Sequence, residues 1–219
     1  MNLFKLSSQL RLVFSVLLCF VSIQAFSQDA TSILKKSAEA YEASNGVKIN
    51  FTLRAYSEKS KSGESFDGVI DMKNEKFKSQ TPDMITWYDG KTQWTYMDRT
   101  EEVNVTEPDG AELQFTNPIV FINSYEKGFK ASLKGTSTTR QGKSAYDIEL
   151  TPKKKGDITK VTIQIEKNTG NLASIDIEAK NGLRNTIVIS KWQTNMNQPD
   201  NFFVFNEEDY PDAEVVDLR

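Results

Sequence analysis

Apolar and polar residues alternate with a period of two along most of the chain after residue 46. In residues 47–55 every second side chain is apolar, from Val47 to Ala55, and residues 66–73 repeat the pattern around Ile70. This alternation predicts β-strands with one buried face and one exposed face. Similar runs predict further strands at residues 75–80, 101–106, 129–136, 144–151, 159–166, 172–179, 185–193 and 202–205.

The clearest hairpin signal is the segment TWYDGKTQWTYM at residues 86–97. Its central Asp-Gly pair suits a tight turn, because both residues tolerate a positive φ. Trp87 and Trp94 are then expected to lie opposite each other across the hairpin. Tyr96 shares the face of Trp94, and Tyr88 points to the other face. A register shift of one residue would exchange the two faces.

Two segments depart from the period of two. Residues 29–44 place apolar side chains, among them Leu34 and Tyr41, on one stripe, which predicts a helix that packs on the sheet. Residues 111–128 are strongly apolar and contain an Asn-Pro pair that suits a helix start, so one or two short helices are predicted there. The other connections are too short for crossover helices, which predicts one antiparallel sheet in a single domain.

The amino-terminal segment has the features of a secretory signal peptide. Lys5 and Arg11 precede an apolar run of about 14 residues, shorter than the ~20 that a membrane-spanning helix needs. Small residues then mark a cleavage site after Ser27. We predict that residues 1–27 are removed and that residues 28–219 form one soluble, secreted domain. An uncleaved membrane anchor is the alternative.

The only cysteine, Cys19, lies inside this segment. Its other possible role is lipidation, which the bulky Leu18 before it disfavours. The mature chain is therefore expected to have no disulfide and no thiolate site. The chain has no histidine, the commonest general base and a usual zinc ligand. We expect no metal, no cofactor and no enzymatic activity, with a hydrolase that acts through carboxylates alone as an alternative.

The charge balance narrows the class of partner. Removing the signal peptide takes away two of the 27 basic residues and none of the 30 acidic ones, so the formal net charge changes from −3 to −5. An acidic chain without a large basic cluster argues against nucleic acid as a partner. The one basic run, at residues 153–155, is expected at a hairpin tip, either as a solvated turn or as a docking point.

The apolar face of such a sheet can be buried in two ways. The sheet can close on an ordinary dry core, which would suit an envelope protein that acts through surface contacts with a protein or glycan. It can also stay open and curved, leaving an apolar cavity for a ligand. Alternation alone slightly favours the first arrangement, the dry core, as it does for most aromatic stripes.

The order of several segments resembles the periplasmic outer-membrane lipoprotein carrier family (LolA-type). The segments are the leading helix, NFT at 50–52, FDGVIDM at 66–72, Phe77, Pro82, WYDGKTQWTY at 87–96, EVNV at 102–105, the apolar insertion at 118–125 and the tail at 203–217. The resemblance implies a mainly β fold with short helices, in which a single unclosed antiparallel β half-barrel is covered by a helical lid.

The resemblance also implies a function. It suggests a monomeric periplasmic carrier that shields the acyl chains of lipoproteins or related lipids and delivers them toward the outer membrane. An inner-membrane donor complex would supply the cargo and an outer-membrane acceptor would receive it. Burial suits such cargo, because each exposed methylene costs ~0.8 kcal/mol in water.

Candidate site residues follow from the same resemblance. The expected lipid-binding cavity residues are Phe51, Leu53, Ile70, Met72, Phe77, Trp87, Trp94 and Tyr96, with Tyr88 as outer packing. The expected lid residues are Ile119, Val120, Phe121 and Ile122. Well-studied family members carry an Arg-Pro pair after the strand that ends here at Met72. Lys73 stands there instead, as a gating candidate that lacks the planar fork of arginine.

Overall fold

The computed structural model describes residues 30–109, 113 and 119–219, and the predicted signal peptide lies outside them. These residues form a mainly β structure with a single sheet of twelve strands. The strands are β1 (Val47–Ser57), β2 (Ser62–Lys73), β3 (Lys76–Gln80), β4 (Met84–Tyr88), β5 (Gln93–Met97), β6 (Glu102–Thr106), β7 (Phe129–Thr138), β8 (Ser144–Pro152), β9 (Ile158–Glu166), β10 (Leu172–Ala179), β11 (Leu183–Thr194) and β12 (Glu214–Asp217).

The sheet is unclosed, as predicted. Its strand order is β12-β6-β5-β4-β3-β2-β1-β11-β10-β9-β8-β7, so β12 and β7 are its two edges. Neighbouring strands are antiparallel, except that β12 runs parallel to β6. The prediction of a wholly antiparallel sheet is therefore wrong at β12. The predicted strand at residues 202–205 is also wrong, because Asp200–Phe203 form a short 3-10 helix, η1.

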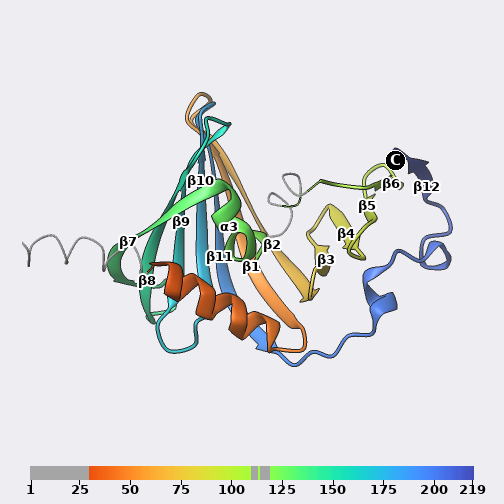
Figure 1. The fold of residues 1–219 in the computed structure, drawn as a ribbon. Coiled ribbons are helices and arrows are strands. Elements are labelled where there is room, and N and C mark those ends of the chain that lie inside the picture. The colour runs from red at the N-terminus through yellow and green to blue at the C-terminus, as the bar shows by residue number, and fades with distance from the viewer. Residues whose placement is uncertain (1–29, 110–112, 114–118) are drawn as a thin grey trace, which may run out of the picture.

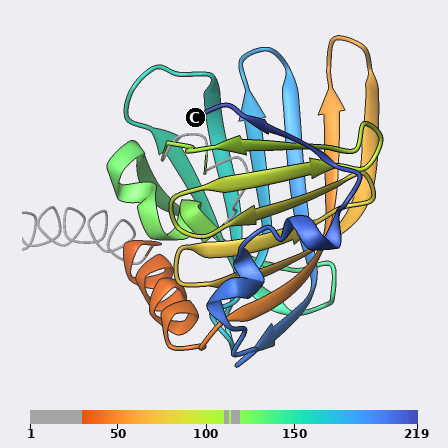
Figure 2. The same ribbon diagram turned by 90° about the vertical axis from the view of Figure 1, so that its right-hand side faces the viewer.

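The sheet curves so strongly that its two halves face each other. β1, β2 and β7–β11 have eight to twelve residues each, whereas β3–β6 have five each. Figure 1 shows the two groups of strands on opposite sides of the molecule. In Figure 2 the short strands lie in front of the long ones and run across them. The result is a half-barrel with a concave inner face and a convex outer face.

A helix over residues 30–42 closes one end of the concave face (Figure 1). Its residues Leu34 and Tyr41 are buried in the main core with apolar side chains of the sheet. The Ser37 hydroxyl donates to the carbonyl of Gly170, in the β9–β10 loop, at 2.6 Å. The Tyr41 hydroxyl donates to the carbonyl of Asn74, in the β2–β3 turn, at 2.8 Å. The helix is thus fixed to loops from two parts of the sheet.

Helix α3 (Ile119–Gly128) lies within the predicted apolar insertion. Its residues Ile122 and Tyr125 are buried in the main core. The helix runs directly into β7, and the Gly128 carbonyl accepts a hydrogen bond from the amide of Lys153 at 2.8 Å. This helix therefore packs on the concave side of the sheet.

The last 25 residues form an extended strap, defined here as residues 195–219. The strap crosses the convex side of the short strands (Figure 2) and ends as β12 beside β6. It covers a second core on the convex face, in which Trp87, Val103 and Phe205 are buried. Apolar packing on both faces of the short strands is thus a basic feature of this fold.

Candidate functional site

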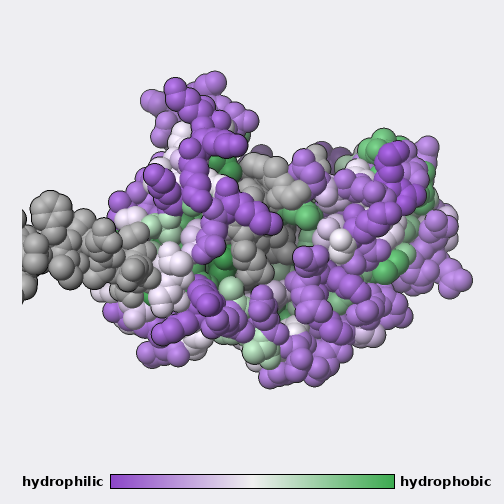
Figure 3. Space-filling model, viewed as in Figure 1, coloured by the Kyte–Doolittle hydropathy of each residue, from purple (hydrophilic) through white to green (hydrophobic). Residues whose placement is uncertain are grey.

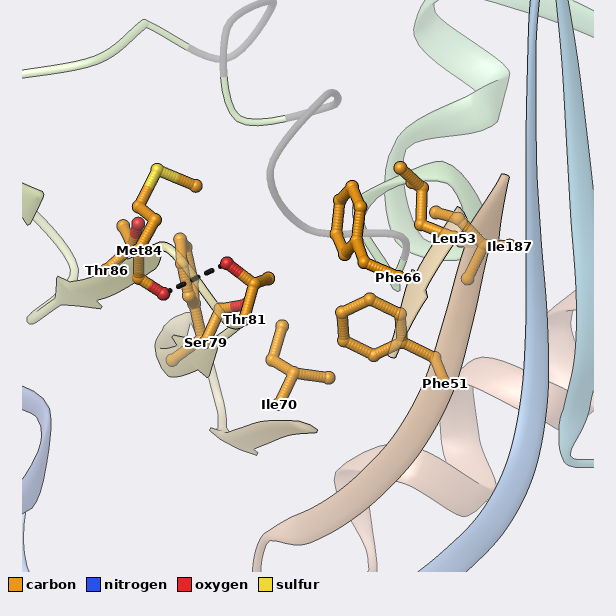
Figure 4. Close-up of a pocket in the computed structure, with 10 residues that line it drawn as sticks. Phe51, Leu53, Phe66, Ile70, Ser79, Thr81, Met84, Thr86 and Ile187 are labelled. Atoms are coloured by element: carbon orange, nitrogen blue, oxygen red, sulfur yellow. Dashed lines mark hydrogen bonds between the residues drawn. The ribbon is translucent and has the colours of Figure 1, made fainter. Parts of the chain in front are cut away.

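An apolar pocket opens on the concave face where the long and short strands meet (Figure 4). It has a cavity volume of about 150 Å³. Its wall comes from β1, β2 and β11 on one side and from β3, β4 and the turn between them on the other. The lining residues are Phe51, Leu53, Phe66, Ile70, Phe77, Ser79, Thr81, Met84, Thr86 and Ile187.

The pocket exists because β2 has a neighbour on its outer side over only part of its length. β2 pairs with β1 throughout, from Ser62 to Met72, but it pairs with β3 only from Val69 to Lys73. Beyond Val69 the short strands diverge from the long ones. The two walls of the pocket are therefore the two branches of the sheet on either side of this divergence.

Gly68 shapes the wall of the pocket at this point. It pairs with Phe51 across β1 and β2, and a Cβ atom at Gly68 would overlap the Phe51 ring. The missing side chain thus lets the ring lie directly on β2. Leu53 pairs with Phe66 on one side and with Ile187 on the other, which extends the same apolar surface over three strands.

The pocket contains no ionisable side chain among its lining residues. The polar groups come from three hydroxyl-bearing residues, and the Thr81 hydroxyl is already bonded to the carbonyl of Met84 at 3.1 Å. Among the described residues no group of three or more His, Cys, Asp or Glu side chains could hold a metal ion. Such a wall suits an apolar ligand, and its lining residues offer no ionisable group that could act as a general base toward these hydroxyls.

Four of the expected cavity residues meet in this pocket: Phe51, Leu53, Ile70 and Phe77. A fifth, Met72, is fully buried in the adjoining main core. Their role in lipid binding stays a prediction. Phe66, Met84 and Ile187 also line the pocket, and the expected set omitted them. The alternation in β2 places Phe66 on the same face as Ile70, so the sequence pattern was sufficient to predict Phe66 as a cavity residue.

The expected placement of Trp87, Trp94 and Tyr96 in the cavity is wrong. Trp87 and Trp94 do lie opposite each other across the hairpin, but on the convex face, together with Tyr96. Aromatic side chains of the strap cover them: the ring centroids of Trp87 and Phe205 lie 5.4 Å apart, and those of Tyr96 and Tyr210 lie 4.7 Å apart. These rings stabilise the attachment of the strap.

Tyr88 is on the concave face, so its expected role as outer packing is also wrong. Its ring lies 5.4 Å from that of Phe77, and the two residues are paired across β3 and β4. Both residues belong to the main core. The reason is the register of β4: because Tyr88 shares a face with Phe77, the neighbouring Trp87 must point the other way.

The gating candidate, Lys73, binds the strap. Its ammonium group donates to the carbonyl of Gln198 at 2.9 Å and lies 3.7 Å from a carboxylate oxygen of Asp200. Lys76 contacts the other oxygen of Asp200 at 2.9 Å. Within the described part of the chain, the polar contacts of Lys73 therefore tie the end of β2 to the strap and not to α3.

A buried polar contact holds the strap beside these ion pairs. The Gln198 amide donates to the Asp71 carboxylate at 2.6 Å, and both side chains are buried. The Lys48 ammonium lies 3.7 Å from the other oxygen of Asp71. Burial raises the pKa of the Asp71 carboxyl, and Lys48 and Gln198 partly offset this effect.

The expected lid is only partly described. Ile122 is buried in the main core, whereas the side chains of Ile119, Val120 and Phe121 lie outside the described residues. A separate question is whether any helix could cross a membrane. Of the helices in the described residues, none combines the necessary length and apolar character.

Several solved structures resemble this chain in fold. An uncharacterized conserved protein from Thermus thermophilus aligns with a TM-score of 0.57 at 11% identity, over 86% of this chain and 99% of that one. A DUF1329 family protein from Desulfovibrio piger aligns with a TM-score of 0.50 at 11% identity, over 84% and 99%. A LolA superfamily protein from Nitrosomonas europaea aligns with a TM-score of 0.43 at 13% identity, over 80% and 97%.

Comparison of sequences identifies the family. No curated protein sequence matches the chain. The family model described as "Outer membrane lipoprotein carrier protein LolA" matches residues 21–179, which is well over half of the 219 residues. The match includes β1–β10 and ends before β11 and the strap. This protein therefore belongs to the LolA family of outer membrane lipoprotein carrier proteins.

Proposed function

We propose that this protein is a periplasmic carrier that holds the acyl chains of a lipoprotein, or of a related lipid, in the pocket on its concave face and delivers them toward the outer membrane. The single observation that carries the proposal is the apolar pocket at the divergence of the sheet. Membership of the LolA family supports the class of cargo.

Physical chemistry favours this class of ligand. Moving an acyl chain from water into an apolar wall gains ~0.8 kcal/mol for each methylene. A wall of Phe, Leu and Ile side chains without a charged group does not select for a particular lipid head group. The carrier would then bind different lipids through their chains, with the head group outside the pocket.

The size of the pocket requires a change on loading. Its volume of about 150 Å³ is below the roughly 300–1,000 Å³ typical of sites for small molecules. An acyl chain would therefore have to widen it. Two motions could widen the pocket. One is movement of α3 as a lid that carries Ile119, Val120, Phe121 and Ile122. The other is rotation of the short strands.

The route of the cargo is part of the same proposal. A soluble carrier in the periplasm would take its cargo from an inner-membrane donor complex and pass it to an outer-membrane acceptor. Lys73 contributes to this cycle only indirectly, since its contacts hold the strap against β2. No cofactor takes part in the proposed cycle.

A titration with a fluorescent triacylated lipopeptide tests the proposal. The wild-type protein is expected to bind it saturably. Phe66→Asp places a carboxylate in the apolar wall, and because that charge must lose water on loading, affinity should fall about tenfold or more. Denaturant unfolding of both proteins shows whether Phe66→Asp is folded.

Ser65→Asp is the matched control. Ser65 precedes Phe66 on β2, is exposed, and points to the convex face, so the same new charge lies outside the pocket. Its affinity should stay within about twofold of wild type, because an exposed carboxylate keeps its water. Absence of saturable binding by the wild type, or equal losses in the two variants, would contradict the proposal and favour a dry core.

A further inference from the structure

Three hairpin loops meet at the end of the half-barrel opposite the residue 30–42 helix (Figures 1 and 2). They are residues 58–61, 153–157 and 180–182, and together they are called the rim. The amide of Glu58 donates to the Gly182 carbonyl at 2.9 Å, and the amide of Lys180 donates to the Asp157 carbonyl at 2.9 Å. The three loops are therefore joined side by side.

The rim is basic although the protein is acidic. It contains six lysines and two acidic residues, whereas the whole chain has a formal net charge of −3. All six lysines are exposed, and Figure 3 shows hydrophilic side chains projecting at this end. Lys59, Lys154 and Lys180 form no ion pair within the described part of the chain. Their charges are thus available to a partner.

The opposite charge is concentrated elsewhere. The strap carries seven acidic residues and one basic residue. It lies on the convex side of the short strands, away from the rim (Figure 1). The molecule therefore has a basic end and an acidic side, and a negatively charged surface would orient it with the rim forward.

Exposed apolar side chains flank the rim. Tyr56 and Leu183, each 43% exposed, stand on β1 and β11 next to its loops. Lysines beside an exposed tyrosine and leucine match the chemistry of a lipid bilayer surface, which is anionic at the head groups and apolar just below them. A small hydrated anion such as phosphate would gain nothing from contact with an exposed leucine.

The rim is also the end of the concave face that the residue 30–42 helix leaves uncovered. Along β11, Ile187 lines the pocket and Leu183 stands at the rim on the same face of the sheet, four residues away. At about 3.3 Å per residue, this separation is about 13 Å. A molecule docked through its rim would thus hold this end of the concave face close to the head groups.

We propose that the rim docks the protein on an anionic membrane surface, so that cargo enters or leaves the pocket at the bilayer. The link to cargo rests on the function proposed above, whereas the docking itself does not. The lysines supply the attraction to anionic lipid, and Tyr56 and Leu183 enter the head-group layer. The acidic strap lies along the side of the molecule and not at the rim (Figure 1).

Sedimentation with lipid vesicles tests the docking. Vesicles of about one part phosphatidylglycerol to three parts phosphatidylethanolamine should bind the protein at about 50 mM salt, and about 500 mM salt should release it. Vesicles of phosphatidylcholine alone should not bind it. Each lysine near an anionic surface strengthens binding about fivefold, so the triple variant Lys59→Glu, Lys154→Glu, Lys180→Glu should lose about a hundredfold or more.

A second triple variant, Lys36→Glu, Arg140→Glu, Lys167→Glu, is the matched control. It changes the net charge equally, at exposed residues on the residue 30–42 helix and on loops at the other end of the long strands. Its affinity for vesicles should stay within a few fold of that of the wild type. The small loss would reflect only the long-range effect of the changed net charge. Any of three results would overturn the proposal: equal losses of vesicle affinity in the two variants, vesicle binding that does not depend on salt concentration, or no vesicle binding by the wild type.

The lipopeptide titration separates docking from carrying. Without vesicles, the rim variant should bind the lipopeptide like wild type, because its substitutions lie outside the pocket lining. If the wild type binds vesicles but not the lipopeptide, the docking proposal stands and the carrier function is refuted. If the wild type binds the lipopeptide but not vesicles, the carrier function stands and the docking proposal is refuted.

Discussion

At the scale of single residues, Asp71 is a buried carboxyl group with a raised pKa. Its side chain is buried on the convex face of β2, where it accepts the hydrogen bond from Gln198 and faces Lys48. Burial raises its pKa above the ordinary value of 3.8, and nearby lysines only partly offset this. The folded protein therefore holds a proton at Asp71 more tightly than the unfolded chain does.

This difference predicts a pH dependence of stability. The contribution of Asp71 to the free energy of unfolding is largest at low pH and is lost as the pH rises above 3.8 and through the higher pKa of the folded state. Asp71→Asn cannot titrate. The free energy of unfolding of wild type minus that of Asp71→Asn should thus decrease between about pH 3.5 and pH 7 in denaturant titrations. A difference that is constant or increases would contradict the raised pKa.

At the scale of elements, the strap connects parts of the sheet that are far from it in the sequence. It contacts the turn before β1 through the amide of Asn195, which donates to the Ser44 carbonyl. It also contacts β2 through Gln198 and β3 through Asp200. It then covers the β4–β5 hairpin with Phe205 and Tyr210. The strap therefore spans the divergence between long and short strands from outside and limits how far they separate.

Two substitutions show which contacts hold the strap. Phe205→Ala removes a nearly buried ring from the convex core and should cost about 3–5 kcal/mol in the free energy of unfolding. Asp200→Ala removes two ion pairs at an exposed carboxylate and should have little effect, since exposed pairs contribute little.

Denaturant unfolding measures both effects, and tryptophan fluorescence reports the convex core. Phe205→Ala should shift the emission of Trp87 to longer wavelength, because the ring loses its cover. Asp200→Ala should leave the emission unchanged. A larger loss of stability in Asp200→Ala than in Phe205→Ala would mean that charge, and not aromatic packing, holds the strap.

At the scale of the whole molecule, the pocket lies at the joint between two unequal halves of one sheet. The long half is covered by the residue 30–42 helix and by α3, whereas the short half is covered by the strap (Figures 1 and 2). Within the sheet the halves are joined through β2 and β3, which share the pairs from Val69 to Lys73. A ligand that widens the pocket would therefore move the short half.

Hydrogen exchange tests this movement. Loading with the lipopeptide should change the exchange of amides in β3 and β4, which form one wall of the pocket. Amides in β8 and β9 should change little, because these strands lie inside the long half. Deuterium uptake measured by mass spectrometry, with and without lipopeptide, provides the comparison. A change in deuterium uptake confined to β8 and β9 would contradict the expected movement of the short half.

The sequence by itself determined most of the strands and their pairing into hairpins. Alternation predicted β10 at its observed bounds and the others mostly within a few residues, because one strand face is buried and the other is not. It also predicted that Trp87 and Trp94 pair across a tight turn. These features depend on contacts between neighbouring segments, so local patterns contain them.

The tertiary structure alone decided which face of each strand became the wall of the pocket. Alternation sorts side chains into two sets, but in β4 and β5 both sets include apolar residues, so periodicity could not show that Trp87 faces outward and Tyr88 inward. The strap settles this, since its distant Phe205 and Tyr210 provide the apolar cover on the convex face. The pocket and the rim likewise result from the path of the whole sheet, which brings together residues that are far apart in the chain.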